Sequence, residues 1–191
     1  MFIQTENTPN PDVIKFIPED EILKSGSMDF KSRKEAASSP FVRSLFAIEG
    51  VKSVYVARDF VSVTKDSELD WGVLKPSVLT TIMEHLVAGL PVMDEDIAEV
   101  KSTPASTINA DDDEVVKQIK ELIDTRVRPS VAEDGGDIIF HSFEDGVVRL
   151  EMHGACAGCP SSTVTLKGGI ENMLKHYVPE VERVEAVNEA G

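Results

Sequence analysis

Both cysteines of the chain lie in one short motif, Cys156-Ala157-Gly158-Cys159, which is followed directly by Pro160. A four-coordinate zinc ion or a [4Fe-4S] cluster usually takes four soft ligands, and this motif offers two of them. A second copy of the chain, related by a two-fold axis, would supply the other two thiolates without any further residue. The motif is therefore typical of half a metal site.

Other uses of a Cys-x-x-Cys pair compete with a cluster. A thioredoxin-type dithiol also has its reactive cysteine at a helix N-terminus, but the βαβ surroundings of that class are not apparent in this sequence. A c-type haem site needs a histidine after the second cysteine, where this chain has Pro160. Zinc is a stronger alternative, because His153, Cys156 and Cys159 are spaced as three borderline-soft ligands. A zinc-bridged structural dimer and a dithiol redox protein stay open beside a cluster-binding protein.

The two cysteines also have a plain structural interpretation, as small apolar side chains of a core. We disfavour it, because a glycine-containing loop that leaves a strand is a poor place to bury a side chain. His153 is the histidine nearest to the motif, and we expect it to stay outside the ligand set, since two cysteine pairs already provide four ligands. His141, on a predicted strand, is expected to be an ordinary packing or surface residue.

Two further features have simple explanations. The segment Asp134-Gly135-Gly136-Asp137 lacks the alternating oxygen ligands and the distant glutamate of an EF-hand loop, so it predicts a turn into a strand. Trp71, the only tryptophan, is expected in the core, whereas an exposed Trp71 would mark a partner-binding patch.

The charge of the chain limits its partners. Its 191 residues include 34 acidic and 19 basic side chains, which give a net charge of −15. Nucleic acid and anionic membrane surfaces attract positive charge, so neither is expected as the main partner. No stretch approaches the roughly 18 apolar residues of a membrane span, and Met1 leads into folded-looking sequence without a signal peptide. We therefore expect a cytoplasmic protein, in whose reducing surroundings a lone cysteine pair indicates a metal or redox site.

The apolar periodicity is interrupted between residues 99 and 110, where Ser, Thr, Pro and Ala replace it. We interpret this segment as a flexible linker between a domain of residues 1–98 and a domain of residues 111–191. Each is large enough to bury a modest core of its own. The predicted fold class is α+β, with two small domains of mixed helices and sheet.

The first domain is expected to contain two pairs of strands and two helices. The predicted strands span residues 2–4, 13–17, 51–57 and 60–65, and the predicted helices span residues 41–48 and 78–87. Arg58-Asp59 is expected to form a tight hairpin turn, and Gly89 to cap the second helix. The domain has no cysteine, no paired histidine and carboxylate, and no Gly-rich phosphate loop, so an enzyme is not expected.

The second domain is expected to follow the order α-β-β-α-β. Its first helix begins near residue 111 and must stop before Pro129. Strands at residues 137–143 and 147–152 are joined by an Asp145-Gly146 turn, a good hairpin signal. A second helix starts at Pro160, and a last strand covers residues 181–187. The start of the Pro160 helix would favour a thiolate at Cys159.

Several stretches closely resemble the Nfu family of iron-sulfur cluster scaffold and carrier proteins. Those that resemble the C-terminal domain of NifU are Arg128-Pro129, Glu133-Asp134-Gly135-Gly136-Asp137, residues 154–162 and residues 166–171. Those that resemble the N-terminal domain of the mitochondrial and alphaproteobacterial members are residues 1–5, 8–11, 48–54 and 69–71. The resemblance covers nearly the whole chain, with two domains in the expected order.

This resemblance implies a [4Fe-4S] cluster bridging a homodimer, to which each chain contributes Cys156 and Cys159. It implies a carrier and not an enzyme, which serves apo-protein clients such as lipoyl synthase and works with upstream cluster-assembly proteins. A half site suits this role, because a cluster enclosed by one chain would have no route to a client. The implied location is the bacterial cytoplasm or, for a processed eukaryotic form, the mitochondrial matrix.

Overall fold

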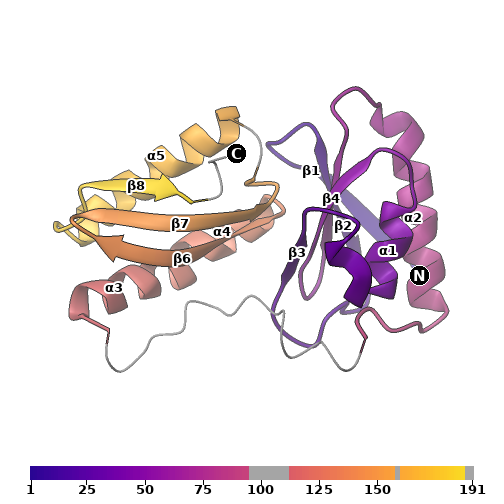
Figure 1. Cartoon of the computed structure of the whole chain (residues 1–191), viewed down its shortest axis with the longest axis horizontal. Coiled ribbons are helices and arrows are strands. Elements are labelled where there is room, and N and C mark those ends of the chain that lie inside the picture. Colours follow the sequence, from indigo (N-terminus) through magenta and orange to yellow (C-terminus); the bar gives the residue numbers. More distant parts are fainter. Residues whose placement is uncertain (95–111, 158–159, 188–191) are drawn as a thin grey trace. The chain divides into compact units, whose positions relative to one another are not determined.

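The computed structural model of the chain describes residues 1–94, 112–157 and 160–187. The chain divides into two compact units, Met1–Thr103 and Pro104–Gly191 (Figure 1). The predicted linker, residues 99–110, lies outside the described residues. In the described part of the chain, no helix has both the length and the apolar composition required to cross a bilayer.

The first unit is built on a five-stranded antiparallel sheet in the order β1-β2-β5-β4-β3. Arg58 and Asp59 lie at the tip of the β4–β5 turn, which is closed by a hydrogen bond from the Ala57 N–H to the Phe60 carbonyl. The predicted hairpin is therefore confirmed. Strand β3 is not predicted, because three residues are too few to show a period of two. The strands are β1 (Ile3–Asn7), β2 (Val13–Pro18), β3 (Met28–Phe30), β4 (Val51–Val56) and β5 (Val61–Lys65).

The first unit also contains the short 3-10 helix η1 (Glu35–Ser38) and the α-helices α1 (Pro40–Phe46) and α2 (Trp71–Val87). Helix α2 begins at Trp71 and not at residue 78 as predicted. The Asp70 carboxylate caps it by accepting a hydrogen bond from the Gly72 N–H at 2.6 Å. Gly89 follows the helix with a φ of +62°, in the capping position predicted for it.

The core of the first unit lies between the sheet and its helices. One buried cluster joins Phe16 of β2, Phe41 of α1 and Ile82 of α2. Trp71 is partly buried and packs against this cluster. Its indole N–H donates to the Pro11 carbonyl at 3.1 Å. Trp71 therefore anchors the start of α2 to the core and does not form an exposed patch.

The second unit contains a three-stranded sheet in the order β6-β7-β8, formed by β6 (Gly136–Glu144), β7 (Val147–Gly154) and β8 (Arg183–Ala186). Strands β6 and β7 form an antiparallel hairpin, and β8 lies parallel to β7. Asp145 and Gly146 both have positive φ, 49° and 75°, as the tightest hairpin turns require. The predicted Asp145-Gly146 turn is confirmed.

A β-bulge interrupts β6 at His141. Phe140 lies opposite Leu150, whereas Ser142 lies opposite Arg149, so His141 is left out of the pairing. The bulge allows Phe140 and Phe143, three positions apart, to pack against the same core. His141 is exposed, which agrees with the surface role expected for it.

A continuous helical stretch precedes this sheet and consists of α3 (Glu114–Leu122), the π-helical segment η2 (Ile123–Val127) and α4 (Arg128–Glu133). The prediction that the helix stops before Pro129 is wrong. In the π turn the Arg128 N–H donates to the Ile123 carbonyl, five residues earlier. The wider turn avoids the clash that a proline causes inside an α-helix. Pro129 itself lies at the start of α4, where its missing N–H costs little.

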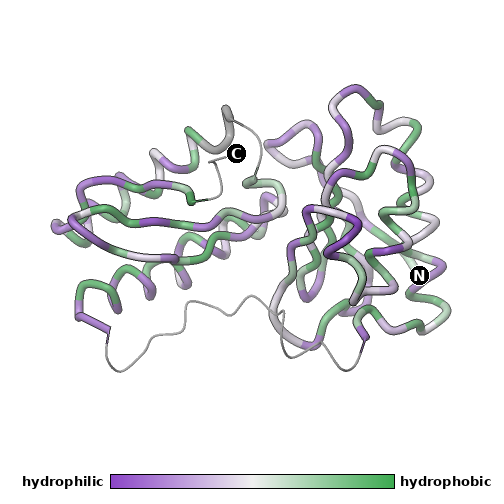
Figure 2. Tube along the Cα trace, in the orientation of Figure 1, coloured by the Kyte–Doolittle hydropathy of each residue, from purple (hydrophilic) through white to green (hydrophobic). Residues whose placement is uncertain are grey.

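Helix α5 (Pro160–Tyr177) follows the cysteine motif and shares one core with the preceding helices. Polar and apolar residues alternate along α3 in Figure 2, as expected of a helix with one buried side. Both helical stretches cover the same face of the sheet, since their buried side chains form one cluster with those of alternate strand positions. The cluster includes Ile119, Ile123, Val131, Ile138, Val148, Leu150, Met152, Ile170 and Leu174.

Candidate metal centre

Cys156 lies in the turn that connects β7 to α5. Gly154 opens this turn with a φ of +61°, and its carbonyl accepts a hydrogen bond from the Ala157 N–H at 3.1 Å. The Ala155 N–H donates to the Gly135 carbonyl at 3.1 Å. The second of these bonds attaches the cysteine turn to the loop that precedes β6. Cys159, the second expected ligand, lies outside the described residues.

The side chain of Cys156 is buried, with 5% of its surface exposed, and it belongs to the core of the second unit. Its sulfur packs directly on Gly136. A Cβ atom at position 136 would lie 2.4 Å from the Cys156 Sγ and 2.8 Å from the His153 carbonyl oxygen, both shorter than real contacts. Gly136 therefore makes the space that the sulfur occupies.

This burial contradicts our argument that a glycine-containing loop is a poor place to bury a cysteine. The loop lies against strand β6, where Gly136 has no side chain at the point of contact, so the sulfur is buried there. Burial by itself consequently does not distinguish a ligand from a packing residue at Cys156.

The burial has an electrostatic consequence. Loss of hydration, together with the smaller effect of the negative charges of Asp134 and Asp137, raises the pKa of the Cys156 thiol to about 12. At neutral pH the buried sulfur is therefore a thiol. Metals bind the thiolate, so Cys156 would have to lose a proton to act as a metal ligand.

An ion pair holds the strand that carries Gly136. The Arg128 guanidinium donates to both carboxylate oxygens of Asp137, from Nε to Oδ1 at 2.8 Å and from Nη2 to Oδ2 at 2.7 Å. Asp137 is buried, and its Oδ1 also accepts the Ile138 N–H at 2.8 Å. Asp124 lies 3.4 Å from the other end of the guanidinium. These interactions, Asp137 foremost, raise the pKa of Arg128 above its usual high value, so its charge is fixed.

The sequence reasoning missed this arrangement. Arg128 and Asp137 enter it only as parts of a family motif, and Gly136 only as part of a turn. The available signal was an arginine and an aspartate, Arg128 and Asp137, on either side of the Gly135-Gly136 pair. This segment leads into the hairpin that the cysteine motif follows.

His153 is buried on β7, opposite Asp137 in the strand register. Its Nε2 lies 3.6 Å from the Glu151 carboxylate. Because side chains alternate along a strand and Met152 faces the core, His153 faces the other side of the sheet. Cys156 belongs to the core on the opposite side, so the geometry does not favour a zinc site that joins His153 to Cys156. Across residues 1–94, 112–157 and 160–187, no three His, Cys, Asp or Glu side chains gather around a possible metal position.

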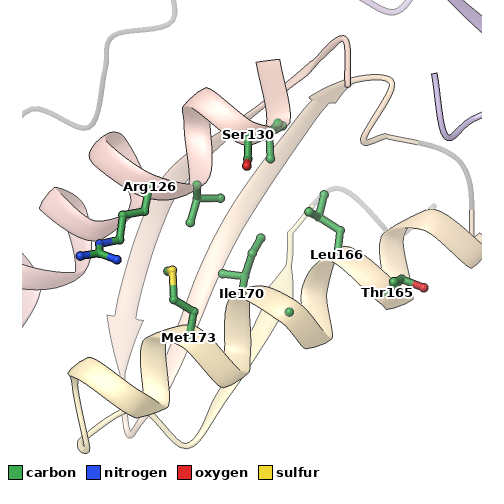
Figure 3. A pocket seen from close by; sticks show the side chains of 9 residues that line it. Arg126, Ser130, Thr165, Leu166, Ile170 and Met173 are labelled. Atoms are coloured by element: carbon green, nitrogen blue, oxygen red, sulfur yellow. The ribbon is translucent and has the colours of Figure 1, made fainter. Parts of the chain in front are cut away.

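A shallow groove of about 320 Å³ runs between the η2–α4 segment and α5 (Figure 3). Leu166, Ile170 and Met173 of α5 project into it. Arg126 is its only charged lining residue, and its guanidinium carbon lies 4.9 Å from the ring centroid of Tyr177. The lining contains no nucleophile beside a general base, so it does not suggest an enzyme site. It is formed by Arg126, Val127, Ser130, Val131, Thr165, Leu166, Gly169, Ile170 and Met173.

Comparison with known proteins assigns the two units together. Residues 3–89 match a family described as the N-terminal domain of scaffold protein Nfu/NifU, and residues 119–185 match the NifU-like domain. The human "NFU1 iron-sulfur cluster scaffold homolog, mitochondrial" is 53% identical over 189 residues, which cover 98% of this chain and 72% of that protein. The chain belongs to the Nfu family of iron-sulfur cluster scaffold proteins.

The chain is also similar to a second curated protein and to a solved structure. The protein of the same name from Drosophila willistoni is 50% identical over 98% of this chain, which spans 64% of that relative. A solution NMR structure of a NifU-like protein from Saccharomyces cerevisiae is 28% identical, covers 50% of this chain and 86% of its own, and superposes with a TM-score of 0.45. Cys156 and Cys159 fall inside the NifU-like match.

Proposed function

We propose that this chain is an iron-sulfur cluster scaffold and carrier, not an enzyme, and that it holds a [4Fe-4S] cluster between two copies of itself. Cys156 and Cys159 of each copy are the proposed ligands, and apo-proteins that need such clusters are the proposed recipients. The observation that carries the proposal is the Nfu match through both units, with the single cysteine pair of the chain inside its NifU-like part.

The position of Cys156 supports a site that gives its cargo away. The sulfur lies in the core of the second unit, beside Gly136. A cluster shared by two chains has to lie at a surface, so loading draws the sulfur out of this place. Release lets the sulfur take up a proton and return to it. Cys156 is therefore proposed as a ligand with a stable alternative position, which lowers the cost of cluster departure.

Partners and location belong to the same proposal. Clients such as lipoyl synthase and upstream cluster-assembly proteins are expected from the family resemblance. The human and Drosophila relatives are named as mitochondrial, which supports the mitochondrial matrix over the bacterial cytoplasm as the setting of this function.

Metal analysis of the full chain tests the proposal. The protein is purified and reconstituted without oxygen, and iron, sulfide and zinc per chain are measured with the Mössbauer spectrum and the molecular mass of the same sample. About two irons and two sulfides per chain in a dimer indicate one shared [4Fe-4S] cluster. Transfer is then followed as the return of activity in an apo client.

Two other outcomes would replace the proposal. About half a zinc ion per chain, with no uptake of iron, would indicate a zinc-bridged structural dimer. Reversible two-electron oxidation of Cys156 and Cys159 in a metal-free monomer would indicate a dithiol redox protein.

A further inference from the structure

The groove between the η2–α4 segment and α5 has an apolar floor and apolar walls (Figure 3). The floor consists of Val127, Val131 and Ile170, each at most 5% exposed. The walls consist of Leu166 and Met173, which are half-buried. Its volume of about 320 Å³ is at the lower end of the range of binding sites. The part of an occupant that enters this groove is therefore apolar.

The groove follows two helices over about two turns. Its lining residues on α5 recur one turn apart from Thr165 to Met173, a span of about 12 Å. Those on the η2–α4 side recur in the same way from Arg126 to Val131. A groove between two helices suits a third helix, whose apolar side chains at spacings of three and four positions enter it in a row. The shape therefore favours a short amphipathic helix as the occupant.

Gly169 lies on the exposed rim of the groove, and the fold of the chain does not require a glycine there. It lies inside α5, where glycine lowers helix stability relative to alanine. A Cβ atom at position 169 would meet nothing within 4 Å, and the backbone φ there is not positive. The missing side chain leaves the helix backbone open to close contact from the groove. Gly168 shares these properties but does not line the groove, so it provides a matched control.

Arg126 provides the charge of the groove, at the end that also contains Met173 (Figure 3). It is exposed and lies over the ring of Tyr177, and it forms no ion pair with any residue that the structure describes. A guanidinium at such a position pairs well with a carboxylate, more strongly beside apolar surface than in open water. An occupant that matches both features therefore combines an apolar side with an acidic residue near one end.

The other end of the groove lies toward the cysteine motif. Thr165 marks this end in Figure 3 and follows Cys159 by only six positions. Val131 of the floor shares one core cluster with Cys156 and precedes Gly136, on which the Cys156 sulfur packs, by five positions. A protein that takes a cluster from these cysteines has to approach this part of the second unit. The groove is thus continuous with the surface that a recipient has to contact.

A second copy of the chain does not suit the groove. A closed two-fold contact requires a surface that is complementary to itself, and two concave grooves that face each other leave a void between them. A different surface of the second copy would make a head-to-tail contact, which builds rings or open filaments and not a closed pair. The occupant is therefore expected to be a different protein.

From these observations we propose that the groove is the docking site for the recipient apo-protein, which inserts an amphipathic helix with an acidic residue against Arg126. This inference rests on the proposed carrier function and adds the surface that selects the recipient. The groove holds the recipient beside the cysteines while the cluster is exchanged. Because a contact of this size falls below that of a stable interface, the binding is weak and reversible.

Cluster transfer tests the role of the groove. The rate of transfer from the reconstituted full-length chain is measured against the concentration of apo-lipoyl synthase, the expected client. Gly169→Ala is expected to raise the concentration at half-maximal rate about three- to tenfold, because a methyl group overpacks the contact. Iron per chain should not change, and the urea midpoint should be unchanged or higher.

Gly168→Ala is the control for this change. It is expected to have the same effect on the urea midpoint and to leave transfer as it is, because position 168 does not line the groove. Weaker transfer in a chain of equal or greater stability cannot result from damage to the fold. Equal transfer by Gly168→Ala and Gly169→Ala would overturn the proposal.

Binding without a cluster separates this inference from the carrier function. Titration calorimetry of the metal-free, reduced chain with the same recipient is expected to detect the complex. Arg126→Glu is expected to weaken it about tenfold or more, whereas Arg43→Glu, exposed on α1 of the first unit, makes the same change in net charge and should have little effect.

The outcomes of these measurements are distinct. No binding by the unmodified chain, or equal binding by Arg126→Glu and Arg43→Glu, would overturn the groove proposal even if the chain loads and transfers a cluster. Failure to take up iron would overturn the carrier function, and the calorimetric measurement would still test the groove.

A photo-reactive residue identifies the occupant. In place of Ser130, on the exposed rim, it is expected to label a helix of the recipient in which an acidic residue lies near apolar ones. In place of Asn172, an exposed residue of α5 outside the groove, it is expected to label much less. Mass spectrometry identifies the labelled segment. Labelling confined to a second copy, or to another part of the same chain, would overturn the proposal.

Discussion

The sulfur of Cys156 occupies the position where a side chain at Gly136 would begin. The 2.4 Å that would separate them leaves no room for even a methyl group, and the second close atom, the His153 carbonyl oxygen, belongs to backbone that cannot turn aside. A residue outside the cysteine motif thus decides whether the first cysteine fits into the core.

Gly136→Ala is expected to expel the Cys156 sulfur and to lower the free energy of unfolding by about 1–3 kcal/mol, as for other overpacked sites. Urea denaturation and the rate of Cys156 alkylation measure the two effects. Gly168→Ala is the matched control, because a Cβ atom there meets nothing within 4 Å in helix α5; it should be neutral or stabilise by up to about 1 kcal/mol. Unchanged stability and alkylation in Gly136→Ala would show that the Cys156 sulfur does not pack on Gly136 in solution.

In the Cys159→Ala variant, Cys156 is expected to react with iodoacetamide at pH 8 far more slowly in the folded chain than in urea. Its pKa of about 12, against an ordinary value of 9.0, makes the thiolate fraction roughly a thousandfold smaller. Mass spectrometry of quenched samples gives both rates. Similar rates in the folded and unfolded chain would show that the sulfur is not buried in solution.

The same pKa predicts a loss of stability in alkaline solution. A thiol with a folded pKa above its unfolded pKa contributes fully to stability below pH about 9, and this contribution is lost as the pH rises toward 12. The urea midpoint of Cys159→Ala should therefore fall more steeply between pH 9 and 11 than that of the variant that also carries Cys156→Ala. Parallel curves for the two variants would contradict a raised pKa for the Cys156 thiol in the folded chain.

Replacing either cysteine is expected to abolish cluster binding and metal-linked dimerisation while both units stay folded. Cys159→Ser and Cys156→Ala are the suitable changes, because a serine hydroxyl at the buried position 156 would add a polar burial cost of about 1–3 kcal/mol. Iron per chain after reconstitution and circular dichroism are measured together. Equal iron retention in a folded variant would exclude that cysteine as a ligand.

Arg128→Met is expected to destabilise the second unit by about 3 kcal/mol, because it leaves the buried Asp137 carboxylate without its counter-charge. Adding Asp137→Asn should recover part of the loss, and this double-mutant cycle separates the pair from its surroundings. Arg126→Met, two residues earlier and exposed, is the control and should cost about 1 kcal/mol or less. Equal losses of stability for Arg126→Met and Arg128→Met would mean that the Arg128–Asp137 ion pair makes no specific contribution.

The sequence predicts those elements that local chemistry determines. The Asp145-Gly146 turn is an example, because its two residues both tolerate positive φ and the turn needs no distant contact. Strand β3 could not be predicted, because it is stabilised by pairing with β4, which is far away in the sequence. The helix across Pro129 was missed for a related reason, since rules for proline assume an α-helical turn.

The candidate site divides in the same way. The type and spacing of Cys156 and Cys159 indicate a soft-metal site, and the family motif around them agrees. The burial of Cys156 was not predictable, because it depends on Gly136 in a neighbouring strand. A contact between residues twenty positions apart leaves no periodic signal in the sequence.

The π turn at Ile123–Val127 fixes the rotational phase of everything that follows it in that helix. Each residue of an α-helix turns the chain by about 100°, so a chain with one residue fewer between α3 and α4 would keep a helix of nearly the same length but would rotate Arg128 away from Asp137. The number of residues in the π turn therefore determines whether Arg128 can reach Asp137 on the strand beside Cys156. A single deletion in this turn would break the Arg128–Asp137 ion pair without replacing either residue.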